Sequence, residues 1–130
     1  MYQSTGTIQY NDYPCKLIVL VDLELVEYYR SMLPKTIRIN RQMYPPHISV
    51  VRNEQPVINE NWRLHEGEQI EFYYDGIIQS GKVYYWLNVF SKRLEEIRNE
   101  LGLPVSSEYT RPPDEYNKCF HTTLGNLKNL

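Results

Sequence analysis

Runs of apolar residues along the chain predict a protein built largely from β-strands. Cys15–Val21 is a continuous apolar run, and we expect it to form a central strand that is buried on both faces. Lys35–Asn40 alternates between polar and apolar residues, as a half-exposed strand does. Further strands are predicted at residues 7–10, 69–74 and 82–90, the last two joined through the turn-forming pairs Asp75-Gly76 and Ser80-Gly81.

Two segments have the apolar spacing and the end signals of helices. Asp22 can cap a helix that continues to about Leu33 and is followed by a proline. Ser91 can cap a second helix over residues 92–101, which Gly102 ends.

The order of these elements repeats once along the chain. A strand, a helix, a loop, a proline-flanked segment and a short strand occur before residue 52, and the same series occurs after it. Polar stretches at residues 53–67 and 105–118 are predicted to be loops. The sequence therefore predicts a single domain, residues 1–130, of the α+β class, in which two similar halves share one cleft.

A short motif, His-x-Ser/Thr, occurs in the last strand of each half. The first copy is His47-Ile48-Ser49 and the second is His121-Thr122-Thr123. Because side chains in a strand alternate between faces, the histidine and the hydroxyl of each copy point the same way. A fold that lays the two strands side by side would gather two imidazoles and two hydroxyls, which is sufficient for phosphodiester chemistry without a metal.

The charge of the chain argues against a long nucleic acid as partner. The formal net charge is −2, from 14 lysines and arginines against 16 acidic residues. Proteins that bind long RNA or DNA carry a basic stripe, because neutralising phosphates dominates that affinity. The densest basic cluster, Lys92, Arg93 and Arg98, is interleaved with glutamates, which is typical of an exposed helix with charge pairs. A small nucleotide fits this composition better.

Cysteine usage and hydrophobicity indicate an intracellular protein without a cofactor. Cys15 and Cys119 have no metal-ligand spacing, and we expect Cys119 to be a small buried thiol. The longest apolar run, residues 17–21, is too short to span a membrane, and the first residues lack the layout of a signal peptide. We therefore predict a cytoplasmic protein, in the host cytoplasm if its origin is viral, with no metal and no cofactor.

At the two motifs, His47-Ile48-Ser49-Val50 and His121-Thr122-Thr123-Leu124, the chain resembles the two-histidine (2H) phosphoesterase superfamily. The resemblance implies a bilobal α+β fold of two antiparallel sheets, with helices packed outside and a central cleft between the motifs. It also implies metal-independent cleavage of 2′,3′-cyclic phosphates, 2′–5′ linkages or oligonucleotide ends. Size and scarcity of basic residues are most similar to phage anti-CBASS nucleases, which degrade cyclic di- and trinucleotide immune signals.

The predicted mechanism divides the work between the four motif side chains. One neutral histidine takes a proton from the attacking oxygen and the other, protonated, gives one to the departing ribose oxygen. Ser49 and Thr123 donate hydrogen bonds to the non-bridging phosphate oxygens. The sequence leaves open which of His47 and His121 is the base.

Residues around the motifs supply candidates for substrate binding. Tyr44 and Tyr13 could stack on a nucleobase. Arg52 lies on the face opposite His47 by strict alternation, so we expect it not to bind phosphate. Lys118 is expected to be solvated, and His65, which has no Ser/Thr partner, to lie on the surface.

Other functions compete with this hypothesis. The chain could be a sponge that binds a nucleotide without cutting it, or an RNA-end-processing phosphoesterase or ligase. A histidine-based metal enzyme fits poorly, because no acidic residues stand at ligand spacing near the histidines. The sequence leaves the natural substrate, the linkage, the oligomeric state and the organism of origin open.

Overall fold

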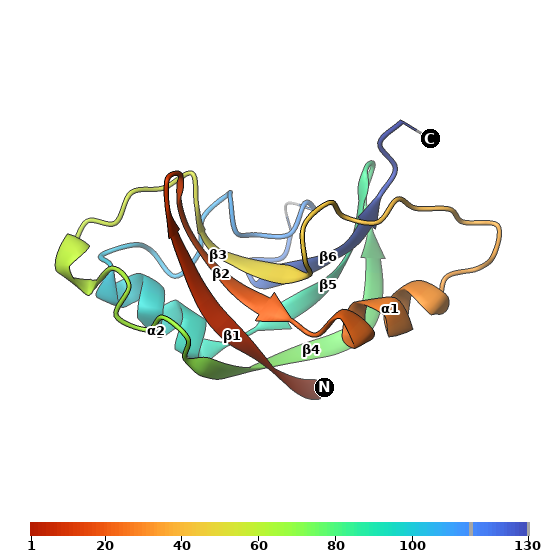
Figure 1. Ribbon diagram of the computed structural model, residues 1–130. Coiled ribbons are helices and arrows are strands. Elements are labelled where there is room, and N and C mark those ends of the chain that lie inside the picture. Colours follow the sequence, from red (N-terminus) through yellow and green to blue (C-terminus); the bar gives the residue numbers. More distant parts are fainter. Residues whose placement is uncertain (115, 130) are drawn as a thin grey trace.

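In the computed structural model, which describes residues 1–114 and 116–129, the strands form one closed antiparallel barrel (Figure 1). Its strand order is β1-β2-β3-β6-β5-β4, with β4 pairing back onto β1. The described elements are β1 (Tyr2–Asp12), β2 (Cys15–Val21), α1 (Leu23–Ser31), β3 (His47–Arg52), a 3-10 turn (Asn59–Asn61), β4 (Gln69–Ser80), β5 (Tyr84–Phe90), α2 (Lys92–Glu100) and β6 (Phe120–Asn126).

The barrel shows that the predicted bilobal α+β fold with two sheets is wrong. The repeated order of elements is present, since each half of the chain reads strand, strand, helix, strand. The halves nevertheless join at two places, β3 to β6 and β1 to β4, so no strand edge remains to separate two sheets. Pairing both edges satisfies backbone groups that two open sheets would leave exposed.

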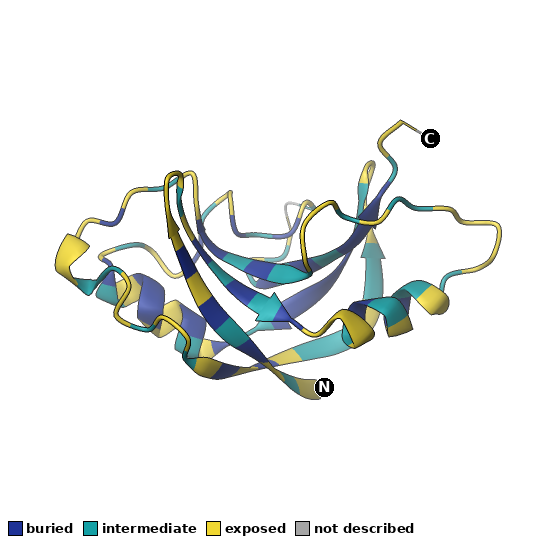
Figure 2. Cartoon of the chain, in the orientation of Figure 1, coloured by how far each residue is buried: buried dark blue, intermediate teal, exposed yellow. Residues whose placement is uncertain are grey.

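The two helices lie at opposite ends of the barrel (Figure 1). Leu94, Ile97 and Leu101, on α2 and just after it, pack into the main core of inward-facing strand residues. Val26 and Tyr29 of α1 pack with Leu87 and Leu124 in a second cluster. Figure 2 shows the result: buried positions alternate with more exposed ones along the strands, as expected when alternate side chains point into the barrel. Burial of these apolar stripes is what fixes each helix to its end of the barrel.

Two of the predicted strands differ from the structure. Residues 35–40 do not form a strand, and only Asn40 makes a bridge, to Asn126. Strand β2 is buried on one face rather than two, because only its inward residues, such as Leu17 and Val19, are enclosed. A barrel strand needs one apolar face, so its outward side chains remain partly exposed.

The remaining strands and both helices agree with the predicted elements, with shifted ends. Strand β1 is longer than residues 7–10, because it pairs with β2 in one part and with β4 in the other. Asp75-Gly76 is an irregularity within β4 rather than a turn, with Gly76 at φ 73°. Asp22 and Ser91 cap α1 and α2 as predicted.

Each motif strand contains a β-bulge three residues after its histidine. On β3, Ile18 of β2 pairs with Ser49 and Leu17 pairs with Val51, so Val50 is the extra residue. On β6 the extra residue is Leu124, because the neighbouring β5 residues Trp86 and Tyr85 pair with Thr123 and Gly125. A bulge reverses the alternation of side chains beyond it.

An arginine from each helix binds the backbone carbonyl of one bulge residue. Arg98 of α2 donates to the Val50 carbonyl at 2.8 Å, and Arg30 of α1 donates to the Leu124 carbonyl at 2.8 Å. The Arg98 side chain is completely buried and forms a bidentate ion pair with Glu54, with both N–O distances 2.9 Å. The prediction that Arg98 belongs to an exposed charged face is therefore wrong, because the carbonyl and carboxylate oxygens around it stabilise a buried guanidinium.

Removing the carboxylate of this pair tests how much the fold depends on it. Glu54→Ala leaves the Arg98 charge buried without its counter-ion, and we expect the free energy of unfolding to fall by about 3 kcal/mol or more. Urea denaturation followed by circular dichroism measures the change. Glu60→Ala, at an exposed glutamate of the 3-10 turn, is the control and should change stability by less than about 0.5 kcal/mol. Equal effects of the two changes would contradict the structural role of the pair.

A second stability prediction concerns Thr122, whose side chain points into the barrel. Its hydroxyl is buried and has no hydrogen-bond partner among the described residues. Thr122→Val keeps the shape and removes the unsatisfied group, so we expect stability to rise by about 1 kcal/mol. The same denaturation experiment measures it, and a loss of stability would show that the hydroxyl is satisfied in solution.

Candidate functional site

The two motif strands lie next to each other, so the four predicted catalytic side chains converge. Strands β3 and β6 are antiparallel neighbours that pair at Ile48 and Thr122. The side chains of these two residues are buried inside the barrel, while the histidine and hydroxyl residues on either side of them are partly exposed. The register therefore places His47 opposite Thr123 and His121 opposite Ser49 on the outer face.

This pairing gives the site a local two-fold arrangement. The imidazoles occupy one diagonal of a four-residue square and the hydroxyls occupy the other. Diagonal neighbours in an antiparallel pair are about 7–8 Å apart at the backbone, which leaves room for a phosphate between two imidazoles.

Both histidines are held by the same ring nitrogen. The Nδ1 of His47 lies 2.9 Å from the Pro45 carbonyl, and the Nδ1 of His121 lies 3.1 Å from the Thr110 carbonyl. A carbonyl only accepts, so each Nδ1 carries a proton and donates it. Each Nε2 is then the nitrogen left to exchange a proton with a ligand.

His121 is held in its neutral form. Burial lowers the pKa of His121 to about 4, and electrostatic repulsion from His47 and Arg52 acts in the same direction. The hydrogen bond to the Thr110 carbonyl and the charge of Asp114 oppose this effect without cancelling it. At neutral pH the His121 Nε2 is therefore an unprotonated acceptor, as a general base requires.

Arg52 belongs to this face, so the prediction that it points away from His47 is wrong. The bulge at Val50 reverses the alternation, and Arg52 lines the same cavity as His47 and Ser49. It also lies near enough to His121 to affect the pKa of that imidazole. The corresponding residue after the second bulge is Asn126, five residues beyond His121 as Arg52 is five beyond His47.

The four motif side chains stand in a cavity of about 980 Å³ on the outside of the barrel. One wall comes from residues 40–44, which follow α1, and the other from residues 108–113, which precede β6. The second wall is tied to the first motif strand, because Arg98 also donates to the Pro104 carbonyl at 2.7 Å. The volume is at the upper end of the range for small-ligand sites.

The lining of the cavity is basic although the chain has a net negative charge. Among the described residues it contains five lysines and arginines against one glutamate: Lys16, Arg41, Arg52, Arg111 and Lys128 against Glu108. Arg41 is paired with Glu27 of α1. A basic cavity on an acidic protein attracts small anions without attracting long nucleic acids.

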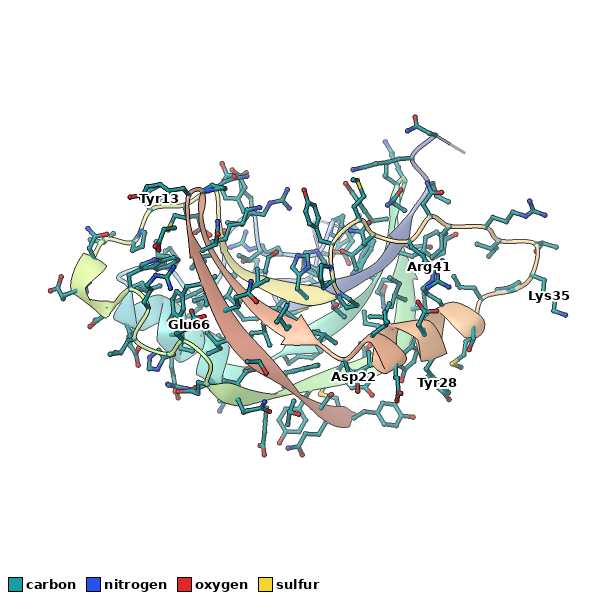
Figure 3. The ribbon with its side chains drawn as sticks, viewed as in Figure 1. Tyr13, Asp22, Tyr28, Lys35, Arg41 and Glu66 are labelled. Carbon is teal, nitrogen blue, oxygen red and sulfur yellow. The ribbon has the colours of Figure 1, made fainter. Side chains whose placement is uncertain are left out.

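Only one of the two tyrosines predicted to bind substrate lies at the cavity. Tyr44 lines it and is 70% exposed, so its ring is free to stack on a base. Tyr13 lies at the turn between β1 and β2, points into solvent (Figure 3) and does not line the cavity. Two tyrosines that the sequence analysis did not single out, Tyr84 and Tyr109, line the cavity as well.

The other residues considered from the sequence lie outside the cavity. Lys118 is exposed, as expected. His65 is not a free surface residue, because its Nε2 lies 2.7 Å from Glu100 and its Nδ1 lies 3.2 Å from Arg93. Burial raises the pKa of the Cys119 thiol to about 11, which makes it unreactive at neutral pH.

Besides Tyr84 and Tyr109, sequence reasoning missed several polar residues of the cavity, among them Arg52, Arg111 and Asn126. The signal for Arg52 and Asn126 is their spacing in the sequence, since each stands five residues after the histidine of its own motif. Alternation alone, however, assigns both residues to the wrong face of the strand. Arg111 carried no signal, since its position depends on the fold of an irregular loop.

Neither a metal site nor a membrane-spanning helix is present in the described part of the chain, and known proteins add no further constraint. Within residues 1–114 and 116–129, no group of three or more His, Cys, Asp or Glu side chains could hold a metal ion. Both described helices are too short to cross a membrane. Comparisons with models of protein families, with curated proteins and with solved structures found no match.

The protonation state of His121 can be measured directly. In an NMR titration, we expect the imidazole of His121 to have a pKa of about 4. Arg52→Gln removes a nearby positive charge, so protonating His121 becomes easier and its pKa should rise. Arg38→Gln, at an exposed arginine away from the cavity, is the control and should leave it unchanged. A wild-type pKa near 6.5, or no effect of Arg52→Gln, would contradict the geometry described.

Proposed function

We propose that this protein is a phosphodiesterase that cleaves small nucleotides by paired-histidine acid–base catalysis. The observation that carries the proposal is the convergence of two His-Ser/Thr pairs on one face, each imidazole fixed through Nδ1 to a backbone carbonyl. The basic cavity around them supports a phosphate-containing substrate. We place this activity in the cytoplasm, where small nucleotide substrates occur.

The geometry favours different roles for the two histidines. His121, neutral at pH 7, takes the proton from the attacking oxygen, which is a ribose 2′-OH or a water molecule. His47 gives a proton to the departing ribose oxygen. A new P–O bond forms at the attacking oxygen as the bond to the leaving oxygen breaks, and the proton count is conserved. Binding of the substrate raises the pKa of His121 and makes it a stronger base, because the negative charge of the phosphate offsets the repulsion from Arg52 and His47.

The two motif hydroxyls stabilise the reacting phosphate. Ser49 and Thr123 lie between the imidazoles on the other diagonal of the site, where their O–H groups can donate to the non-bridging oxygens. The two-fold arrangement suits a second step, in which the histidines exchange roles to hydrolyse a 2′,3′-cyclic product. The same arrangement also fits RNA-end processing or ligation.

Cyclic di- and trinucleotides that act as immune signals are the substrates the sequence resemblance favours, and we propose them as the first class to test. A protein that binds such a nucleotide without cutting it is the alternative outcome. The low pKa of His121 favours cleavage, since a binder of anions is better served by a charged imidazole.

The test is digestion of a nucleotide panel with excess EDTA, followed by mass spectrometry. The panel contains 2′,3′-cyclic mononucleotides, linear 2′–5′ and 3′–5′ dinucleotides, and cyclic di- and trinucleotides. We expect turnover by the wild type and a loss of at least about 10³-fold in kcat for His47→Ala and for His121→Ala. His65→Gln, at the histidine outside the cavity, is the control and should stay active if circular dichroism shows it folded.

The other outcomes separate the competing functions. If the protein retains one panel member and releases it intact after denaturation, it is a nucleotide-binding protein and not an enzyme. Activity that EDTA abolishes would point to a metal enzyme. Joining of RNA ends instead of cleavage would identify a ligase.

A further inference from the structure

One end of the cavity contains like charges that the proposed proton transfers do not use. Lys16 of β2 and Arg52 of β3 are directly opposed in the register of the two strands, and both are exposed. Both side chains line the cavity, so they project from the same outer face. Like charges directly opposite each other on neighbouring strands destabilise a sheet.

The carboxylates nearest to this pair along the chain are bound elsewhere. Asp12 is held by Arg63 through two nitrogens, and both oxygens of Glu54 are held by Arg98. Within the described residues, neither Lys16 nor Arg52 takes part in an ion pair. Glu108, the carboxylate among the described lining residues, forms no ion pair with either of them, so an anion in the cavity can relieve the repulsion.

Arg111 adds a third cation from the wall formed by residues 108–113. Its Nε donates to the Ser106 hydroxyl at 3.0 Å, which fixes the side chain and leaves the two terminal nitrogens free of protein partners among the described residues. The preceding residue, Thr110, holds His121, so Arg111 stands at the His121 end of the site. A guanidinium with free terminal nitrogens binds phosphate oxygens in bidentate fashion.

We propose that Lys16, Arg52 and Arg111 form a subsite for a second phosphate of the substrate, next to the scissile phosphate between the histidines. This inference rests on the proposed function and narrows its substrate class. Arg52 is three residues beyond Ser49 on β3, a span of at most roughly 10 Å, which one nucleotide unit can bridge. The cavity volume of about 980 Å³ accommodates more than one nucleotide.

The subsite disfavours one of the substrate classes that the motifs alone allow. A nucleoside 2′,3′-cyclic monophosphate has a single phosphate, which cannot occupy the scissile position and the subsite together. The preferred substrates are nucleotides with at least two phosphates, such as cyclic dinucleotides, cyclic trinucleotides or dinucleotides with a terminal phosphate.

The experiment compares kcat/KM for three adenosine dinucleotides in wild type and variants. ApA has only the scissile phosphate, whereas pApA and ApAp carry a second one at either end. In the wild type we expect the better of the two phosphorylated forms to exceed ApA by about tenfold or more. Lys16→Gln and Arg111→Gln should reduce this ratio toward one. Lys35→Gln, at the far bend of the segment after α1 (Figure 3), should leave the ratio unchanged.

Failure of the subsite and failure of the enzyme give different results. Cleavage of ApA as fast as both phosphorylated forms, or equal ratios in wild type and Lys16→Gln, would overturn the subsite and leave the phosphodiesterase intact. If nothing is cleaved, calorimetric titration with pApA and ApAp decides. Binding that Lys16→Gln weakens about tenfold would keep the subsite and reject catalysis, and absence of binding would reject both.

Discussion

The hydrogen bonds from Arg98 and Arg30 to the bulge carbonyls are the interactions on which the rest of the site depends. A bulge removes a residue from the regular ladder and leaves its backbone polar groups in need of partners. At Val50 and Leu124 a guanidinium supplies that partner at 2.8 Å. The bulges in turn decide which side chains share a face with the histidines, so the composition of the cavity follows from these two contacts.

The supporting contacts cross between the halves of the chain. Helix α1, from the first half, supports strand β6 of the second, and helix α2 supports strand β3 of the first. Arg98 also joins the end of β3 to the segment before β6 through Glu54 and the Pro104 carbonyl. A local two-fold symmetry thus exists within one barrel, where a pair of independent lobes was expected.

Most helices and strands, and the positions of the two motifs, could be predicted from the sequence because they depend on local signals. Caps at Asp22 and Ser91, the apolar run of β2 and the two His-x-Ser/Thr strands were visible in the residues themselves. Closure of the barrel could not be predicted, because the pairing of β1 with β4 joins residues that are 62 to 72 positions apart and leaves no signal in the composition. Arg52 was assigned to the wrong face because a bulge interrupts alternation and is set by tertiary contacts. Tyr13 was proposed from its position in the sequence alone, and that position does not determine how far its side chain lies from the cavity.

The crossed support has a consequence for how the chain folds. The bond from Arg30 to Leu124 spans 94 residues and the bond from Arg98 to Val50 spans 48, so both close only when distant segments have already met. Contacts of such long sequence separation form late and all together, since each requires much of the chain to be ordered first. Partly folded chains would therefore lack the face that carries the two histidines, and a chain cut between its halves would regain it only by reassociation of both fragments.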